Sequence, residues 1–374
     1  MPASSSSHRP ALAIFRSPLF NASEGFVQAQ AAALIRYAPL MVGIEDKGHA
    51  LPALAGRLLI ADRPLQVRLG RVAALAAQLR PHAPVLVHAH FATDALIALP
   101  LARALGVPLV TTLHGYDVHR ARARLLLSGR LSWMRYALLQ RRLIEGGALF
   151  LAVSDALRRE AIARGFPAER TLTHYLGVDL ARFAGPSAPE PGLILHVGRL
   201  VEKKGTATLL EAMALLPEAR LAIVGDGPLR AALERQATPL GERVRFLGAL
   251  PPARVAAWMR RAWLFAAPSV TARDGDAEGL PTVIAEAAAA GLPAVGTAHA
   301  GIPEAIAHGV TGFVVPERDA GALAAALAAV IASPALRERM GAAALALARE
   351  RFDLARQAAR LEDLYDRLLG QTRP

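Results

Sequence analysis

Short apolar segments alternate with polar, glycine-containing loops and helix-forming stretches along most of this 374-residue chain. The first unit has the apolar segment Ala11–Phe15, a loop, and a helical stretch from about Val27 to Arg36. Strands that alternate with helices in this way predict an α/β fold. Because the chain exceeds the usual size of one hydrophobic core, we expect two domains.

The segment 185–191 contains three prolines and is typical of a linker between domains. We therefore expect a disordered tail at 1–10, a first domain at 11–185, a second at 186–352 and a terminal helix at 353–374. The segments predicted to form strands are Ala11–Phe15, Leu40–Ile44, Arg57–Ile60, Val85–His88, Val107–Thr112, Ala148–Val153, Thr171–Tyr175, Leu193–Val197, Arg220–Val224, Arg243–Leu247, Leu264–Ala267 and Gly312–Pro316.

The composition favours a globular protein of a reducing compartment. Cysteine is absent, which excludes disulfides and thiolate metal sites. The polar segment Met1–Pro10 lacks the apolar core of a signal peptide, and no stretch reaches about 18 uninterrupted apolar residues. We therefore expect a cytoplasmic protein that is neither exported by this route nor membrane-spanning.

The excess positive charge is concentrated in the first half of the chain. Residues 1–185 hold 22 basic and 11 acidic side chains, whereas residues 186–374 hold 21 and 20. This imbalance predicts an anionic partner, and nucleic acid is disfavoured because aromatic residues make up only 5% of the chain. The segment Arg120–Arg142 carries seven arginines with leucines at helical spacing. It forms either a helix with a solvated basic face or a surface for anionic lipid headgroups.

Two carboxylates flank a predicted helix start in the segment 274–293. Pro281 suits the first helical position, and the alanine-rich run 282–290 favours a helix that Gly291 ends. Glu278 is thus expected in the loop and Glu286 inside the helix. The helix start leaves three unpaired N–H groups beside Gly279, those of Thr282, Val283 and Ile284. These groups predict a phosphate-binding site.

Other polar clusters directly follow predicted strands, at the edge where parallel α/β sheets bind ligands. In the first half these are His88-Ala89-His90-Phe91 and His114-Gly115-Tyr116-Asp117. Their spacing matches no metal-ligand pattern, so no metal is expected. In the second half, Gly198-Arg199 with Lys203-Lys204-Gly205 suits a diphosphate, and Gly225-Asp226-Gly227 repeats the glycine turn.

These motifs together resemble the retaining nucleotide-sugar glycosyltransferases of family 4. The resemblance rests on Gly198-Arg199, Lys204-Gly205, Gly225-Asp226-Gly227, the spacing from Glu278 to Glu286, and Gly301-Ile302-Pro303-Glu304. In the first half the motifs look like the branch that builds bacterial exopolysaccharides, including colanic-acid-type enzymes; they are Ser23-Glu24-Gly25-Phe26-Val27, the two histidine clusters and Gly177-Val178-Asp179. The resemblance implies a GT-B fold, in which two Rossmann-like domains face each other across a cleft and a C-terminal helix crosses back to the first.

The resemblance also implies roles for individual residues. Arg199 and Lys204 would hold the donor diphosphate, Glu286 would accept the ribose hydroxyls, and Glu278 would lie at the donor sugar. His114 would reach the transferring sugar. The other implied donor residues are Gly198, Gly225, Gly227, Leu247, Gly279, Leu280, Thr282 and Val283; the acceptor-side residues are Glu24, Gly25, His90 and Asp117. No metal and no further cofactor are implied.

The resemblance therefore predicts metal-independent, retaining transfer of a sugar from a nucleotide donor to a lipid-linked or growing glycan at the inner face of the cytoplasmic membrane. Two features depart from the family pattern. Gly25 stands where the family usually has a threonine. Asp274-Gly275-Asp276 resembles the metal-binding Asp-x-Asp motif of another glycosyltransferase fold, but we interpret these three residues as part of a loop. A soluble acceptor, nucleotide-sugar epimerisation and a non-catalytic binding subunit are the alternatives.

Overall fold

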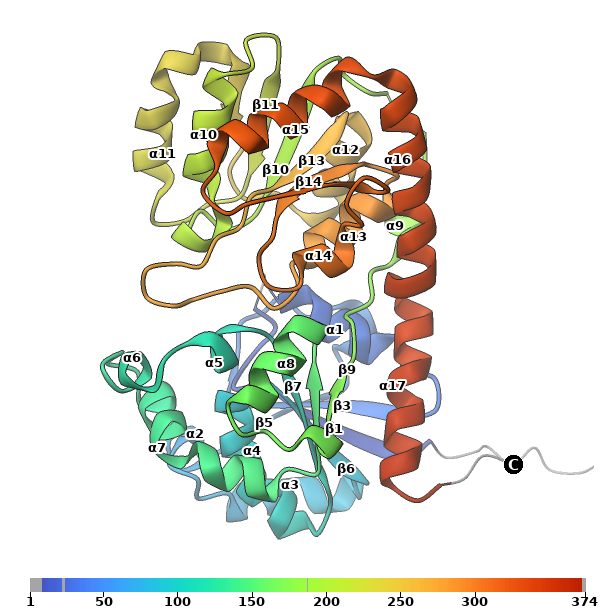
Figure 1. The fold of residues 1–374 in the computed structure, drawn as a ribbon. Helices are drawn as coiled ribbons and strands as arrows, with labels where there is room; N and C mark the ends of the chain where they lie inside the picture. Colours follow the sequence, from blue (N-terminus) through green and yellow to red (C-terminus); the bar gives the residue numbers. More distant parts are fainter. Residues whose placement is uncertain (1–8, 22–23, 187, 372–374) are drawn as a thin grey trace, which may run out of the picture. The chain divides into compact units, whose positions relative to one another are not determined.

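The computed structural model describes residues 9–21, 24–186 and 188–371, and it divides into two compact units (Figure 1). Unit 1 combines the residues up to Val153 with Arg158–His174 and the segment from Leu354 on. Unit 2 combines Ser154–Leu157 with Tyr175–Asp353. The proline-rich segment 185–191 thus lies within unit 2. Most of the tail expected at 1–10 lies outside the described residues.

Unit 1 is built on a seven-stranded sheet in which every neighbouring pair of strands is parallel. The strand order is β5-β3-β1-β6-β7-β8-β9. Because the chain runs outward in one direction from β1 and in the other from β6, the switch point of this sheet lies between these two strands. In order across the sheet the strands are Leu58–Ile60, Ala38–Gly43, Ala11–Phe15, Leu86–His90, Leu109–Leu113, Leu149–Ala152 and Thr171–Thr173.

Unit 2 repeats the same plan with six parallel strands in the order β12-β11-β10-β13-β14-β15. Its switch point lies between β10 and β13. Across the sheet the strands are Val244–Phe246, Arg220–Val224, Leu193–Val197, Leu264–Ala267, Ala294–Thr297 and Gly312–Val315. The sequence did not predict β14, which has only four residues, one of them a glycine. Every strand that the sequence did predict is present, with small shifts of the strand ends.

The strands form in these places because they can be buried on both faces. Every residue of β6, β7 and β8 is buried, as is every residue of β13 and β14. Such continuous apolar runs are typical of parallel sheets covered by helices. The longer helices that follow the strands are α1 (Gly25–Ala32), α3 (Ala73–Leu79), α4 (Ala92–Leu105), α7 (Leu131–Gly146), α8 (Asp155–Ala163), α10 (Thr206–Ala214), α11 (Arg230–Ala237), α12 (Pro252–Arg261), α13 (Thr282–Ala289), α15 (Ala320–Ala332), α16 (Pro334–Leu347) and α17 (Leu354–Leu368).

Among the described residues, no single helix has the length and apolar composition needed to cross a membrane. One bent pair, Ala320–Ala332 with Pro334–Phe352, passes the same criteria of length and composition together, with an angle of 102° between its members.

The terminal helix α17 packs on the core of unit 1, as the resemblance to GT-B enzymes predicted. Its apolar face contributes Ala358, Leu361 and Tyr365, all buried in the cluster that holds Leu12 and Met41 of β1 and β3. These residues form the apolar face of α17.

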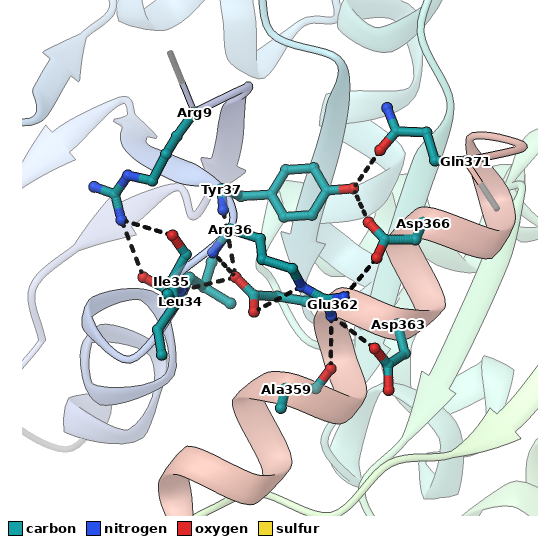
Figure 2. A network of polar contacts seen from close by, with 10 residues as sticks. All are labelled: Arg9, Leu34, Ile35, Arg36, Tyr37, Ala359, Glu362, Asp363, Asp366 and Gln371. Atoms are coloured by element: carbon teal, nitrogen blue, oxygen red, sulfur yellow. Dashed lines mark hydrogen bonds and ion pairs between the residues drawn. The ribbon is translucent and has the colours of Figure 1, made fainter. Parts of the chain in front are cut away.

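Arg36 and Tyr37, just before β3, fasten α17 to unit 1 with polar contacts (Figure 2). The Arg36 guanidinium lies 2.7 Å from Asp366, 2.8 Å from Asp363 and 3.2 Å from Glu362. The hydroxyl of Tyr37 donates to Asp366 at 2.7 Å. The sequence predicted a helix through Arg36, but α1 ends at Ala32; Arg36 lies in a bend before β3 and its N–H donates to Glu362.

Candidate active site

The carboxyl edge of the unit 2 sheet brings three loops together at the switch point. They are the loop after β10, which holds Gly198 to Gly205, the loop after β11 at Gly225, and the long segment from β13 to α13. In open α/β sheets this position is where ligands bind.

Two glycines explain how closely these loops approach one another. A Cβ atom on Gly225 would lie 1.9 Å from the carbonyl oxygen of Gly198, and one on Gly205 would lie 1.7 Å from that of Pro268. Both glycines have positive φ angles, 135° and 65°. A larger residue at either position would separate the loops, so these glycines set the shape of the edge.

Arg199 is the exposed cation of this edge. Among the described residues, its side chain has no ion-pair or hydrogen-bond partner. Lys204, in contrast, lies 3.0 Å from Glu278, and Lys203 lies 3.3 Å from Asp276 and 3.9 Å from Glu278. The two lysines and the two acids balance each other, which leaves the charge of Arg199 available to an anion.

Glu278 is buried, with 8% of its surface exposed. Burial by itself raises the pKa of its carboxyl group, but the charges of Lys204 and Lys203 outweigh burial and lower the pKa to about 2. The side chain is therefore an ionised carboxylate at neutral pH. The structure thus pairs directly two residues, Lys204 and Glu278, that the resemblance assigned to different parts of the donor.

Glu286 differs from Glu278 in having no partner for its carboxyl group within the described part of the chain. It is half-buried on α13, and burial raises its pKa to about 7, with only a small opposing effect of Arg182. A carboxylate that is desolvated and unpaired can accept hydrogen bonds from ligand hydroxyls.

The start of α13 differs in detail from the prediction. Pro281 is the N-cap rather than the first helical residue, and the N–H of Ile284 donates to the carbonyl of Pro281. Among the described residues, the N–H groups of Thr282 and Val283 have no partner and remain available to a ligand, where three such groups were expected. Gly279 and Leu280 are buried directly before this helix start.

The remaining predicted donor residues lie on neighbouring loops of the same edge. Gly227 is half-buried in the loop after β11, and a Cβ there would lie 2.5 Å from the carbonyl of Leu200. Leu247 directly follows β12. Asp274 and Asp276 lie in the segment before Glu278, where the N–H of Asp276 donates to the Asp274 carboxylate at 3.0 Å. Within the described residues, no group of three or more His, Asp or Glu side chains could hold a metal ion.

In unit 1, the switch point holds a buried arginine that the sequence did not single out. Arg16, directly after β1, lies 2.5 Å from Asp94 of α4 and 2.7 Å from Glu24. Asp94 also accepts a hydrogen bond from the N–H of Ser17. Glu24, predicted on the acceptor side, therefore pairs with Arg16, while Gly25 is exposed at the start of α1.

The predicted histidines meet at the neighbouring strand ends. His90 Nδ1 lies 3.0 Å from His114 Nε2, and the ring of Phe91 lies 4.2 Å from that of His114. Burial, reinforced by nearby positive charge, lowers the pKa of both histidines well below the usual value. Both rings are therefore neutral at pH 7. Phe91 has a φ angle of 68°, a strained conformation for a non-glycine residue that is often found at functional sites.

Asp117 is buried and its oxygens accept hydrogen bonds from backbone N–H groups. The donors are Ala92 at 2.9 Å, Gly115 at 2.9 Å and His114 at 3.1 Å. This carboxylate thus joins the loop after β6 to the loop after β7 and fixes the backbone of His114. A contact of Asp117 or His90 with an acceptor stays a prediction.

The structure adds two residues to the unit 2 edge that the sequence did not indicate. His299, in the loop after β14, accepts a hydrogen bond from the N–H of Glu278, and Glu317 contacts the other ring nitrogen of His299. The only hint in the sequence was that His299 stands two residues before the Gly301–Glu304 motif. Glu304 itself accepts hydrogen bonds from the N–H groups of Asp155 and Ala156.

The sequence matches two family models that together span most of the chain. Residues 36–182 match Glycosyltransferase Family 4, and residues 178–346 match Glycosyl transferases group 1. The amylovoran biosynthesis glycosyltransferase AmsK of Erwinia amylovora is 31% identical over 344 residues, which cover 84% of this chain and 81% of that protein. The chain belongs to glycosyltransferase family 4.

This family 4 member is also similar to the putative colanic acid biosynthesis glycosyltransferase WcaL of Salmonella typhimurium. The two are 36% identical over 254 residues, which cover 64% of this chain and 60% of WcaL, less than two thirds of its length. The relatives thus lie in exopolysaccharide biosynthesis, the branch that the motifs of the first half predicted.

The fold of this family 4 member agrees with solved GT-B structures. The crystal structure of Anabaena Alr3699/HepE in complex with UDP and glucose matches with a TM-score of 0.77 over 96% of this chain and 100% of that one, at 23% sequence identity. Sucrose-phosphate synthase from Thermosynechococcus elongatus matches with a TM-score of 0.75 over 97% of this chain and 100% of that chain, at 21% identity. The predicted GT-B fold, with two Rossmann-like units of parallel strands, is confirmed.

Proposed function

We propose that this protein transfers a sugar from a nucleotide-sugar donor to a growing, lipid-linked glycan, with retention of anomeric configuration. The observation that carries the proposal is the charge pattern at the unit 2 switch point. Within the described residues, Arg199, in the loop after β10, is a cation without a side-chain partner, and Glu286, on α13, is a half-buried carboxylate without one; both belong to the same edge of the sheet. A nucleoside diphosphate needs both, because its phosphates are anionic and its ribose hydroxyls are donors.

Each donor group has a candidate partner at this edge. Arg199 and Lys204 bind the diphosphate together with the free N–H groups at the start of α13, Glu286 accepts the ribose hydroxyls, and Leu247 faces the base. Glu278, with the backbone of Gly279 and Leu280, binds the sugar. Lys204 then exchanges its ion pair with Glu278 for one with phosphate.

Cation binding also supports the chemical step. The bond between the anomeric carbon and the diphosphate oxygen breaks, and the leaving oxygen gains negative charge that Arg199 and Lys204 stabilise. The acceptor hydroxyl attacks from the same face, and its proton passes to the departing phosphate. Because the two side chains neutralise that charge, the proposal needs neither a metal ion nor a further cofactor. His114 is the group of unit 1 that we propose for contact with the transferring sugar.

Removal of the proposed cation should abolish most of the activity. We expect Lys204→Ala to lower kcat by about 100- to 1,000-fold, as loss of one stabilising donor does in other transferases and hydrolases. Lys203→Ala is the matched control, since it removes the neighbouring lysine, and should change kcat by less than about tenfold. Donors are screened first by thermal shift with UDP-, GDP- and ADP-sugars, because saturating ligand stabilises the folded state.

Normal turnover by folded Lys204→Ala and Glu286→Gln proteins would show that the site is elsewhere. Product analysis by NMR separates the alternatives. A transferred sugar with inverted configuration contradicts retention, release of an epimerised nucleotide sugar indicates an epimerase, and tight donor binding without turnover on any acceptor indicates a binding subunit.

We also propose that the protein acts at the inner face of the cytoplasmic membrane, through the surface formed by Arg120–Arg142 and α2 (Pro64–Arg68). Leu127, Leu131 and Leu138 are 82%, 51% and 60% exposed. Leu65 of α2 and Leu69, directly after it, are 66% and 49% exposed. The two elements adjoin, since Arg135 donates to the carbonyl of Arg68. Exposed leucines among arginines suit the headgroup region of an anionic bilayer.

Vesicle flotation tests this surface. Each arginine near an anionic bilayer contributes about 1 kcal/mol, so the triple variant Arg122→Gln/Arg124→Gln/Arg130→Gln should weaken binding to phosphatidylglycerol vesicles by about 100-fold. Leu138→Ser should also weaken binding, whereas Leu215→Ser, which changes an equally exposed leucine of unit 2, should not. Equal binding of the wild type to neutral and anionic vesicles would contradict the membrane proposal.

A further inference from the structure

A buried histidine holds the backbone of Glu278. The N–H of Glu278 donates to His299 Nε2 at 3.1 Å, and His299 Nδ1 lies 2.6 Å from a Glu317 oxygen. A backbone N–H can only donate, so Nε2 must be the acceptor and carries no proton. The ring proton therefore lies on Nδ1 and is donated to Glu317, which fixes the tautomer of His299 from geometry alone.

Glu317 is itself fixed by the start of the same segment. Its carboxylate accepts a hydrogen bond from the N–H of Thr271 at 2.9 Å. Partial burial raises its pKa, but the hydrogen bonds from Thr271 and His299 outweigh burial, so the pKa is lower than usual. Glu317 is thus an ionised acceptor that joins Thr271, at one end of the 271–278 segment, to His299, which holds the other end.

The next residue of the segment is held by the same loop after β14. The carbonyl of Gly279 accepts hydrogen bonds from the N–H of Gly301 at 3.0 Å and from the hydroxyl of Ser154 at 3.1 Å. A Cβ on Gly301 would lie 2.5 Å from that carbonyl oxygen, so the contact requires glycine. His299 and Gly301 therefore hold the backbone of the consecutive residues Glu278 and Gly279 through hydrogen bonds.

We propose that the His299–Glu317 pair is a positioning device for Glu278 in the sugar-binding part of the donor site; this inference rests on the proposed function. The Glu278 carboxylate is paired with Lys204. When the diphosphate binds Lys204, that ion pair is lost and the carboxylate needs another restraint. The hydrogen bond from its own backbone to His299 does not involve Lys204 and persists, so Glu278 keeps its place beside the sugar.

Two substitutions at one position separate the roles of the histidine. In His299→Gln the side-chain carbonyl can reach the place of Nε2 and still accept from the Glu278 N–H. In His299→Asn the shorter amide can reach Glu317 but not Glu278. Both variants remove the ring and are similarly polar, so a merely structural role predicts equal effects, whereas a positioning role predicts that glutamine rescues function.

The first readout needs no donor. Hydrogen–deuterium exchange should become faster in the 271–280 segment of His299→Asn and stay close to wild type in His299→Gln. Two-bond ¹H–¹⁵N NMR of histidine-labelled protein at pH 7.5 should show His299 with its proton on Nδ1, its signal assigned by its loss in the His299→Gln protein. A proton on Nε2, or unchanged exchange in His299→Asn, would overturn the proposal.

The second readout uses the nucleotide sugar selected by the thermal screen and its parent nucleoside diphosphate. A small displacement of a positioned group can lower rates by on the order of 100-fold. We expect His299→Asn to weaken binding of the nucleotide sugar by about 10- to 100-fold and leave the affinity for the nucleoside diphosphate within about threefold, with His299→Gln close to wild type. Equal losses for both ligands would contradict a role at the sugar. If the wild type binds no nucleotide sugar, the proposed function fails, while the exchange experiment still decides whether His299 holds Glu278.

Discussion

The two sheets have the same strand order around their switch points, but the charged side chains there differ in burial and in pairing. In unit 1 the arginine after the first strand, Arg16, is buried between two carboxylates, and the histidines beside it are neutral. In unit 2 the arginine after the first strand, Arg199, is exposed and has no side-chain partner within the described residues. Glu286 of the same edge also lacks a carboxylate partner in the described part of the chain, and its pKa is raised.

This difference separates scaffold from binding site. A buried charge with partners contributes to a fixed local structure, and loss of one partner leaves the other buried and unpaired. A charge without a partner lowers stability or contributes nothing, and a ligand can supply the missing interaction. We infer that the polar groups of the unit 1 edge mainly hold loops in place, whereas those of the unit 2 edge are available to bind a ligand.

The largest test of this comparison is to remove each arginine in turn. Arg16→Ala should destabilise the protein by about 3–5 kcal/mol, because the buried Asp94 and the half-buried Glu24 would lose their cation. Arg199→Ala should change stability by less than about 0.5 kcal/mol, as is usual for exposed positions, and should lower donor affinity. Urea denaturation followed by circular dichroism measures both. Equal changes in the free energy of unfolding for the two variants would contradict the distinction between a structural edge in unit 1 and a ligand-binding edge in unit 2.

The second test concerns the paired glutamate. The folded-state pKa of Glu278 is about 2, against an ordinary value of 4.5. A lowered pKa gives stability that is present above pH 4.5 and is lost as the pH falls toward 2. Glu278→Gln should therefore destabilise the protein by about 3 kcal/mol at pH 7.5, at about 1.4 kcal/mol per pKa unit. The difference from wild type should narrow below pH 4.5 in the same denaturation assay.

The third test concerns the unpaired glutamate, for which the sign is reversed. Glu286 has a folded-state pKa of about 7, so the stability linked to its protonation is present below pH 4.5 and is lost as the pH rises through 7. Because the side chain is partly exposed, Glu286→Gln should stabilise the protein by only about 1–3 kcal/mol at pH 8. The variant should nevertheless bind the donor more weakly. A loss of stability at pH 8 would show that this carboxylate has a partner in solution.

The smallest expected effect lies at Gly25, where the family pattern has threonine. A Cβ at this position would meet no atom within 4 Å, and the residue is exposed at the start of α1. Gly25→Ala should therefore stabilise the protein by about 0.5 kcal/mol, because alanine favours the helix and restricts the unfolded chain. A thermal shift of unit 1 measures this change, and a decrease in stability would indicate that the glycine is needed for backbone geometry.

The sequence predicted most of the fold because parallel strands are marked by continuous apolar runs and by the glycine turns after them. Leu193–Val197, Arg220–Val224 and Leu264–Ala267 were predicted with their observed ends. The strand at Ala294–Thr297 was missed because four residues with a glycine carry little periodic signal. The strand order could not be predicted, since it depends on contacts between segments far apart in the chain.

The candidate site was predicted less completely than the fold. Arg199, Lys204, Glu278 and Glu286 stand in recognisable motifs. The structure places the first three in the connections after β10 and β13, and Glu286 on α13, which follows β13. The residues that hold these groups escaped prediction, because a supporting contact such as Glu278 with His299 joins positions 21 residues apart and leaves no local pattern. The ion pair of Lys204 with Glu278 was missed for the same reason.

The attachment of α17 to unit 1 affects the order in which the chain can complete its two units during synthesis. The core of unit 1 includes Ala358, Leu361 and Tyr365, which leave the ribosome after the whole of unit 2. Unit 2 can therefore assemble from nearly continuous sequence while unit 1, although begun first, still lacks a side of its core. A premature stop before Leu354 would thus damage the N-terminal unit more than the C-terminal one.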